Sequence, residues 1–458
     1  MIVIESEDKY SDWWNKLILE SSVADNRYNV KGFFVWMPYG FSIMKNIRLK
    51  WDALFAENGI KEVYFPLLVP VDYAKKNSSW WASFQEQAFY VLGFADKEKE
   101  LFLRPTGEPA MYPIFSNWIR SHRDLPLRVY ETVSSFRNET KSTKTFVRDV
   151  EVGPWYEIHS CHATKEGAEE EIALAVKMNE EIYSDLAVAY LKVRKPLSDC
   201  FPGSVGAIEF YTAMNDKLVE NASCNNLGQA YAKAYDIKFV DTDEKKKFVW
   251  QTCTGNGERF LSAVISNHSD DKGLVLPPKI APIKAAIVIV GVKESEVFSK
   301  MNLLIPKSQV KVFVLEKFSE IGSARFETEK LGIPVRIEIG PKEMDLGKAT
   351  VIFRNGGKSQ VEFAKINAEL TKGFDKLQDQ LFDASKKELL KRVKECSSVE
   401  DAKKSMIAVV GWCGSVECAD LLKHDLDKDL IGMTEKLEKK KCLHCGKEGE
   451  KTYFSKSY

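Results

Sequence analysis

The residue types best suited to chemistry lie in two short segments of the chain. In the first, Thr106 and Glu108 are separated by one residue within a loop rich in proline and glycine, and this hydroxyl and carboxylate could together hold a small cationic amine. In the second, Arg137 and Glu139 stand two apart, so on a strand both would point to one face. An arginine on such a face can hold phosphate and carboxylate oxygens bidentately. Together the segments indicate chemistry between a nucleotide and an amino acid.

Length and composition limit the classes of protein to consider. A chain of 458 residues is too long for one core, so roughly two to four domains are expected. Its 66 basic and 66 acidic residues cancel, which argues against a uniformly basic nucleic-acid coat but allows a local basic surface. We find no signal sequence and no apolar run long enough to span a bilayer, so the cytoplasm is the expected location. The nine cysteines are an odd number and do not suggest a disulfide framework.

Hydrophobic periodicity predicts the elements that hold these segments. Helices are expected over 10–20, 42–57, 110–121, 168–191 and 260–267. Strands are expected over 63–69, 127–136 and 146–156, the last two antiparallel and joined by a charged loop, with a further β-rich stretch over 207–251. Pro66 lies within the first strand, which therefore belongs at a sheet edge or an interface.

A second part begins after a proline-rich boundary at 277–282. Residues 285–292 form a continuous apolar run that is typical of a buried parallel strand. Helices alternate with further strands over 310–315, 335–339 and 349–353, which predicts a small α/β domain. A charged helix over 364–394 and a cysteine-bearing module follow.

Two further arginines are candidates for binding phosphates. Arg148 is expected on the strand that returns after Arg137, and Arg259 follows a glycine turn at the start of an apolar helix. Taken alone, each of these arginines is explained more simply as part of an exposed charge pair or as a solvated side chain. Their order along the chain is what favours a nucleotide site.

This order resembles that of class II aminoacyl-tRNA synthetases. Pro66 on its strand is similar to motif 1, Phe136-Arg-Asn-Glu139 to motif 2 and Gly257-Glu-Arg259 to motif 3. The resemblance is closer still to prolyl-tRNA synthetases of the archaeal/eukaryotic type, and it runs from about residue 10 to residue 458. It is carried by Arg104-Pro-Thr-Gly-Glu108, Ser121-His-Arg-Asp-Leu-Pro126, Trp155-Tyr-Glu-Ile-His159, Asn226-Leu-Gly-Gln229 and Gly273-Leu-Val-Leu-Pro-Pro278.

The resemblance implies a role for each site residue. Thr106 and Glu108 would bind the secondary ammonium of proline, and Arg137 would bridge its carboxylate and the α-phosphate of ATP. Catalysis would rest on Arg137, Glu139 and Arg259. The proline pocket would further include Phe84, Trp155, His159 and Asn225. ATP, with Mg²⁺, would lie against Arg137, Glu139, Arg148, Glu220, Ser223, Gly257 and Arg259.

Several positions differ from the family pattern. Gly107 stands where the family usually has serine, Pro109 where it has threonine, and Asn225 where it has a pocket histidine. Thr254 replaces a tryptophan before motif 3. Glu220 and Glu258 add acidic groups that are expected near the ATP phosphates, where Mg²⁺ would offset their charge.

These differences keep two alternatives open. Gly107, Pro109 and Asn225 are compatible with a paralogous class II synthetase that activates another small amino or imino acid. Glu220 and Glu258 are compatible with a non-catalytic tRNA-binding or regulatory protein on the same scaffold. The retained arginines argue against that second alternative, because a dead site has no physical need for converging cations.

Two cysteine pairs predict a metal site near the end of the chain. Cys413 and Cys418 have four residues between them, and Cys442 and Cys445 have two. Such pairs in a cytosolic protein match a tetrahedral zinc site, and four thiolates leave no open position, so a structural Zn²⁺ is expected. His444 is a further, less favoured ligand.

The α/β domain between these parts would bind the anticodon. Its segment 336–343 resembles the family sequence R-I-E-I-G-P-R-D, and Glu338, Lys342 and Arg354 are the candidate contacts. Guanine offers two acceptors to arginine or lysine, and its amino and imino groups suit a carboxylate. The alternative is a charged strand end.

We therefore expect an α/β and α+β multidomain protein that ligates proline to tRNA(Pro) through a prolyl-adenylate. Residues 1–282 would form a class II catalytic domain with an antiparallel sheet of six or so strands and flanking helices. Residues 283–363 would form the anticodon domain, and residues 364–458 a linking helix and a zinc module. Motif 1 implies a homodimer, and neither a membrane nor DNA is expected as a partner.

Overall fold

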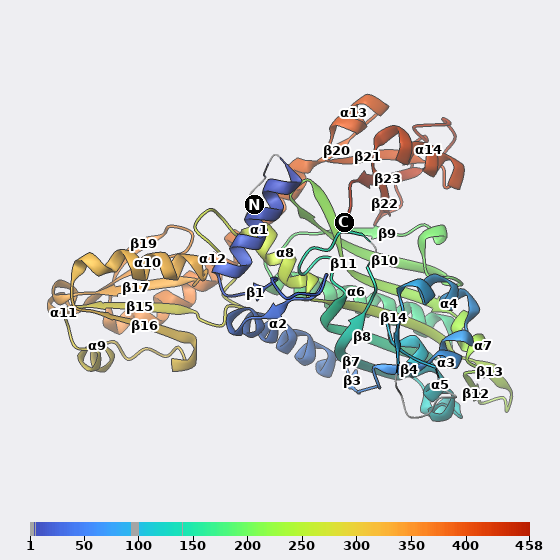
Figure 1. The fold of residues 1–458 in the computed structure, drawn as a ribbon, viewed down its shortest axis with the longest axis horizontal. Helices are drawn as coiled ribbons and strands as arrows, with labels where there is room; N and C mark the ends of the chain where they lie inside the picture. Colours follow the sequence, from blue (N-terminus) through green and yellow to red (C-terminus); the bar gives the residue numbers. More distant parts are fainter. Residues whose placement is uncertain (1–3, 5, 93–99, 140) are drawn as a thin grey trace.

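The computed structural model describes residues 4, 6–92, 100–139 and 141–458. Its main element is a sheet of 11 strands, on the right in Figure 1. In spatial order the strands are β20 (Val393–Glu395), β21 (Ile407–Trp412), β23 (Glu450–Ser455), β22 (Asp429–Thr434), β9 (Leu191–Arg194), β10 (Gly206–Met214), β11 (Lys217–Gly228), β14 (Trp250–Gly257), β8 (Glu151–His162), β7 (Leu127–Phe136) and β3 (Lys61–Glu62).

The predicted antiparallel sheet is confirmed, and it has 11 strands where six or so were expected. Neighbouring strands are antiparallel except at the two edges, where β20 pairs with β21 and β3 pairs with β7 in parallel. The four strands from the cysteine-bearing end of the chain continue the same sheet, because β22 pairs with β9 through Met433 and Arg194. The C-terminal part is therefore attached to the catalytic strands by backbone hydrogen bonds.

Four helices pack on this sheet: α1 (Glu7–Glu20), α2 (Pro38–Glu57), α6 (Lys165–Asp185) and α8 (Arg259–His268). Their apolar faces meet the strands in the largest hydrophobic cluster, which includes Trp14, Trp51, Tyr156 and Phe260. The Trp51 and Tyr156 rings lie 4.9 Å apart. Each buried side chain of this size contributes about 2–3 kcal/mol. The packing fixes the start of α8, where Arg259 stands.

The remaining elements around the large sheet are short. They include two short sheets, β1 (Ala24–Asp25) with β2 (Val35–Trp36) and β12 (Lys238–Val240) with β13 (Lys246–Phe248), and a three-stranded sheet of β4 (Leu68–Pro70), β6 (Leu101–Leu103) and β5 (Phe89–Val91). The short helices are α3 (Val71–Lys75), α4 (Ser78–Phe84), α5 (Glu108–Trp118), α7 (Ala230–Ala234), α13 (Val399–Lys404) and α14 (Val416–Leu426).

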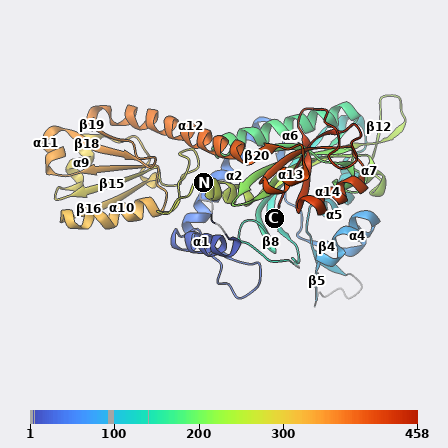
Figure 2. The same cartoon turned by 90° about the horizontal axis from the view of Figure 1, so that it is seen from above.

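A separate five-stranded sheet lies on the left in Figure 1. Its order is β16 (Val310–Leu315), β15 (Ala285–Val290), β17 (Val335–Ile339), β18 (Lys348–Phe353) and β19 (Lys358–Glu362). Strand β15 is buried along its whole length between two parallel neighbours, as its apolar run predicts. The helices of this part are α9 (Glu294–Met301), α10 (Ile321–Lys330), α11 (Pro341–Leu346) and α12 (Ile366–Arg392). Figure 2 shows α12 reaching from this sheet to the larger one.

Two predicted strands need correction. The stretch 63–69 is not one strand, because Pro66 lies in irregular chain between β3 and β4. The strand predicted over 146–156 begins only at Glu151. Before it the chain turns, since the Arg148 amide donates to the Lys144 carbonyl at 2.8 Å and Phe146 has a φ of 67°. Arg148 therefore lies in a turn, not on the returning strand.

No helix in the described part of the chain is both long enough and apolar enough to cross a bilayer.

A buried ion pair joins Arg104, which follows β6, to Glu131 on β7 of the large sheet. Both side chains have no exposed surface, and the guanidinium donates to the carboxylate. The second carboxylate oxygen accepts from the Phe65 amide at 3.0 Å, and Arg104 also donates to the Phe65 carbonyl at 3.3 Å. The pair thus holds the segment before Pro66 against β7.

Glu131→Ala is expected to lower the free energy of unfolding by about 3–5 kcal/mol, because it leaves the Arg104 guanidinium buried without a counter-charge. Chemical denaturation measures the change. The double variant Arg104→Met with Glu131→Leu removes both charges and should recover most of the loss. Equal destabilisation by the single and double variants would show that the charge balance of this pair does not matter.

Candidate active site

A cavity of about 350 Å³ opens on the face of the large sheet formed by β8, β10, β11 and β14. It brings together most of the residues predicted to bind proline and ATP. Those on its walls are Phe84, Thr106, Glu108, Arg137, Trp155, Glu220, Ser223, Asn225 and Arg259. Four predicted residues, Glu139, Arg148, His159 and Gly257, do not line it.

Thr106 and Glu108 enter the cavity from the loop that precedes α5. Both are almost fully buried, at 4% and 1% exposure, and Glu108 is the first residue of the helix. The Thr106 hydroxyl and the Glu108 Oε2 atom have no hydrogen-bond partner among the described residues. Burial and the neighbouring Glu157 raise the pKa of Glu108 to about 7. A cation placed here would satisfy both groups.

The cavity floor contains Glu157, which the sequence analysis missed. It alternates with Trp155 and His159 along β8, so the three side chains share one face of the strand. Glu157 lines the cavity at 2% exposure and its Oε2 atom lies 3.3 Å from His159 Nε2. The alternation along the strand could have identified Glu157 from the sequence, because it places this carboxylate between two residues already assigned to the pocket.

His159 lies below the cavity and does not form its wall, which corrects the prediction. It is fully buried, and its Nδ1 atom lies 2.9 Å from the Tyr112 hydroxyl. Gly107 covers it: a Cβ atom at Gly107 would lie 2.3 Å from Glu157 Oε2 and 3.1 Å from His159 Nε2. The absent side chain at position 107 therefore makes room for the Glu157 carboxylate.

Arg137 lines the cavity beside Trp155. Its Nε atom donates to the Pro105 carbonyl at 3.3 Å, and its guanidinium carbon lies 5.6 Å from the centre of the Trp155 ring. Desolvation and the nearby Arg259 lower the pKa of Arg137, so the site favours an anion beside it. Strand β7 ends at Phe136, however, so Arg137 and Glu139 do not share the face of a strand.

Arg259 is held by backbone carbonyls at the start of α8. Its Nε atom donates to Val147 at 2.9 Å and Nη1 donates to Glu220 at 2.7 Å. The Glu220 carboxylate lies 3.7 Å from the same guanidinium and is 41% exposed. The side chain of Arg259 thus has a fixed direction beside an acidic group on the cavity wall.

Two further predicted site residues, Asn225 and Gly257, contact neighbouring parts of the sheet. Asn225 donates from Nδ2 to the Ser223 hydroxyl at 3.1 Å. Gly257 allows close packing of two strands, because a Cβ atom there would lie 2.6 Å from the Pro154 carbonyl.

Glu258 does not point into the cavity, contrary to expectation. It is 1% exposed, and its Oε2 atom accepts from the Gly153 amide at 2.9 Å. Burial and the adjacent Asp149 raise its pKa, and burial raises the pKa of Asp149 to about 7. Glu258 is therefore turned away from the cavity, and its raised pKa disfavours a negative charge there.

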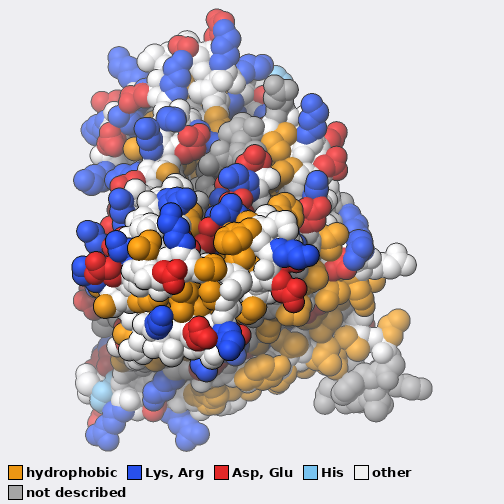
Figure 3. All heavy atoms as spheres, turned by 90° about the vertical axis from the view of Figure 1, so that its left-hand side faces the viewer, with side chains coloured by type: hydrophobic (Ala, Val, Ile, Leu, Met, Phe, Trp, Pro, Cys, Tyr) orange, Lys and Arg blue, Asp and Glu red, His pale blue; other side chains and the backbone are white. Residues whose placement is uncertain are grey.

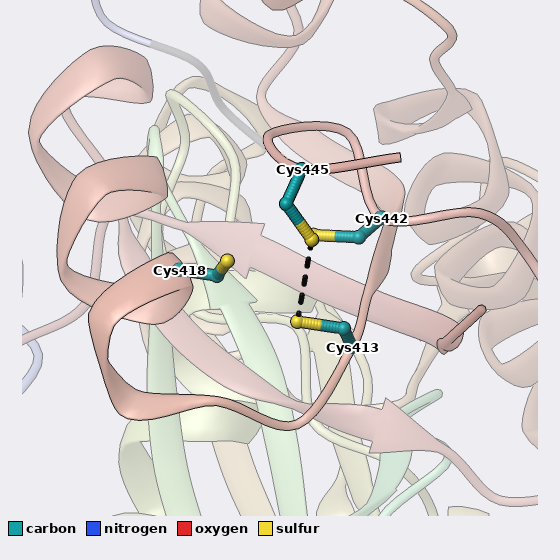
Figure 4. Close-up of side chains that lie close together, drawn as sticks. All are labelled: Cys413, Cys418, Cys442 and Cys445. Atoms are coloured by element: carbon teal, nitrogen blue, oxygen red, sulfur yellow. Dashed lines mark hydrogen bonds between the residues drawn. The ribbon is translucent and has the colours of Figure 1, made fainter. Parts of the chain in front are cut away.

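The four predicted cysteines meet between the end of β21, α14 and the loop that joins β22 to β23 (Figure 4). Their sulfur atoms all lie within 4.8 Å of one another, and Cys413 and Cys445 are 3.7 Å apart. A tetrahedral zinc with bonds of about 2.3 Å to sulfur requires separations of about 3.8 Å. The cluster is therefore compatible with a zinc ion.

Two of the three residues predicted at the anticodon are engaged within the protein. Arg354 forms a bidentate pair with Asp270 at 2.7 and 2.9 Å, and its side chain is 6% exposed. Glu338 accepts from Arg325 at 2.7 Å and from Arg336 at 2.8 Å. Only Lys342, on α11, is exposed.

An exposed aromatic side chain that the sequence analysis missed lies beside them. Phe318 is 65% exposed, and its ring edge would lie 3.4 Å from a Cβ atom at Gly340. Figure 3 looks onto this end of the molecule and shows apolar side chains gathered among charged ones. Hydrophobic periodicity does not identify Phe318, because this residue lies in a short connection between β16 and α10.

Comparison with known proteins agrees with this architecture. Residues 89–268 match the tRNA synthetase class II core domain (G, H, P, S and T), and residues 284–373 match the anticodon-binding domain. The proline–tRNA ligase of Methanococcoides burtonii is 34% identical, with 99% of this chain and 98% of the relative covered. That of Thermoplasma acidophilum is also 34% identical, with 99% of each covered.

A solved structure shares the whole fold. Giardia lamblia prolyl-tRNA synthetase in complex with prolyl-adenylate superposes with a TM-score of 0.93 at 29% identity, covering 100% of this chain and 99% of that one. Similarity of this extent in both sequence and structure shows that the chain belongs to the proline–tRNA ligase family of class II aminoacyl-tRNA synthetases.

Proposed function

We propose that this chain joins proline to tRNA(Pro) in two steps, forming prolyl-adenylate from proline and ATP and then transferring the prolyl group to the tRNA. The observation that carries this proposal is one cavity lined by Glu108 and Thr106 and also by Arg137 and Arg259. The first two offer oxygen acceptors to an ammonium group, and the two arginines offer guanidinium groups to a carboxylate and phosphates.

The chemistry needs positioning and charge neutralisation more than a covalent catalyst. Glu108 and Thr106 would hold the secondary ammonium of proline, while Phe84 and Trp155 pack against its ring. Arg137 would orient the proline carboxylate toward the α-phosphorus and stabilise the charge that develops there. Arg259 would bind the outgoing phosphates, and Mg²⁺ would supply the remaining positive charge beside Glu220.

Other predicted residues would act from the edge of the site. Ser223 and Asn225 line the cavity and would limit the shape of the ligand. Glu139 and Arg148 would contact ATP only after moving toward the cavity, whereas Gly257, at the end of β14, would contact it through its backbone. His159 would act through Glu157, by holding that carboxylate in place.

We further propose three functional regions, with a catalytic domain at 1–282, an anticodon domain at 283–363 and a linking helix with a zinc module at 364–458. We also propose a homodimer. Its support is an exposed apolar surface on and beside α2, which includes Phe41 at 52%, Leu49 at 55% and Tyr64 at 74% exposure. Sedimentation should then give about twice the chain mass of 52.1 kDa.

Amino-acid-dependent exchange of pyrophosphate into ATP tests the ligase proposal. Proline should support exchange in preference to a panel of other amino acids, and Arg137→Ala should lower kcat/KM by about 100-fold or more. Arg123→Ala, which changes an exposed arginine away from the cavity, serves as the matched control. Exchange with another amino acid would favour the paralogue, and tRNA binding without any exchange would favour the non-catalytic scaffold.

Phe318→Ala tests the anticodon surface. Exposed aromatic rings can stack on unpaired bases, so the variant should raise KM for tRNA(Pro) about tenfold in aminoacylation and leave proline-dependent exchange unchanged. Leu437→Ala removes a similarly exposed apolar side chain, 62% exposed, from the C-terminal part and should have no effect. An unchanged KM for tRNA in Phe318→Ala would remove this residue from the interface.

Zinc analysis tests the C-terminal cluster. Protein dialysed against a weak chelator should retain one Zn²⁺ per chain, and Cys442→Ser should lose it and unfold at a lower temperature, because zinc binding contributes to folding. Cys396→Ser alters another buried thiol of the same region and should keep the metal. Wild-type protein without zinc at full stability would contradict the structural role.

A further inference from the structure

A second group of side chains of metal-ligating types lies on the cavity wall and directly beneath it. Glu108 comes from the start of α5, His159 from β8 and Cys253 from β14. His159 and Cys253 are directly paired across the two strands, with Nε2 and Sγ 3.9 Å apart. One ligand atom from each of the three residues lies within 4.8 Å of the others, and exposure is 1%, 0% and 6%.

The donor types match those that zinc takes. Thiolate, imidazole and carboxylate are all zinc ligands, with bonds of about 2.3 Å to sulfur and about 2.0–2.1 Å to nitrogen. Tetrahedral geometry then places sulfur and nitrogen about 3.6 Å apart, so the observed 3.9 Å needs an adjustment of a few tenths of an ångström. Three protein ligands leave a fourth position, which here faces the cavity.

The surroundings orient the ligands toward a cation. The Tyr112 hydroxyl lies 2.9 Å from His159 Nδ1, which leaves Nε2 directed at the cluster. The Glu108 Oε2 atom is buried and has no partner among the described residues. Glu157, 3.3 Å from His159 Nε2, adds a second carboxylate to the same small space. The unpartnered Glu108 oxygen and the Cys253 sulfur therefore leave room for a cation that would displace the contact between His159 and Glu157.

We propose that Glu108, His159 and Cys253 form a second, exchangeable site for zinc or another thiophilic divalent cation, with the open position toward the cavity. Binding releases the Cys253 thiol proton to solvent as the sulfur–metal bond forms. The same Glu108 carboxylate would hold the substrate ammonium in the proposed function, so metal and proline exclude each other. Zinc then inhibits proline activation competitively.

Cobalt spectroscopy tests the site independently of catalysis. The full chain, with its C-terminal cluster already holding zinc, is titrated with Co²⁺. One further equivalent should bind with a thiolate-to-cobalt charge-transfer band, and proline should abolish the band. Cys253→Ser should lose it, whereas Cys200→Ser, which removes the other cavity cysteine, should keep it. No band, or a band that persists in Cys253→Ser, overturns the proposal.

Inhibition kinetics separate this proposal from the ligase function on which the competition rests. Added Zn²⁺ should raise the KM for proline in exchange without lowering kcat, and Cys253→Ser should lose that sensitivity. Exchange that proceeds normally without a cobalt band leaves the ligase function intact and refutes the metal site. A cobalt band in a chain that exchanges with no amino acid supports the metal site and refutes the ligase function.

Discussion

The buried pair of Arg104 and Glu131 is the interaction on which the site depends most directly. Arg104 stands at the end of β6, and its backbone amide donates to Leu67 while its carbonyl accepts from Phe136. Its side chain donates to Glu131 on β7 and to the Phe65 carbonyl, while Glu131 accepts from the Phe65 amide. Since Arg104 immediately precedes the Pro105–Glu108 loop, the ion pair fixes one wall of the cavity relative to the strand that delivers Arg137.

A second constraint is the charge balance of the cavity. Its walls carry Arg137 and Arg259 together with several carboxylates, which include Glu108 and Glu157, so they offer groups complementary to the cationic and anionic parts of an amino acid and a nucleotide. The raised pKa of Glu108 and the lowered pKa of Arg137 show that burial penalises both charges until a ligand of opposite sign arrives. Binding energy is thus available from groups that already lie in place.

Two positions that differ from the family pattern each have their own structural reason. Gly107 makes room for Glu157, and Glu258 supports the chain at Gly153 from behind the site. Neither substitution adds charge where a nucleotide would lie. Glu220 and Asn225 remain on the cavity wall, so they are the positions at which this chain could adjust its ligands.

The sequence by itself determined the family and most of the elements. Strands 127–136, 310–315 and 335–339 were predicted with their observed bounds, because their apolar patterns are long and bordered by clear breaks. It also identified the cysteines of the C-terminal cluster and nine of the 19 residues that line the cavity, since residue type and order carry that information. It failed where the chain turns, as at Lys144–Arg148, because hydrogen bonds between backbone groups, not periodicity, set that path.

Only the tertiary structure decided which side chains share a space. It placed His159 under Gly107, joined Arg354 to Asp270 and turned Glu258 away from the cavity, through contacts between segments distant in sequence. It also brought Cys253 beside His159, which are 94 residues apart. Spacing along a chain specifies faces of single elements, whereas the direction and protonation of a buried group depend on every element packed around it.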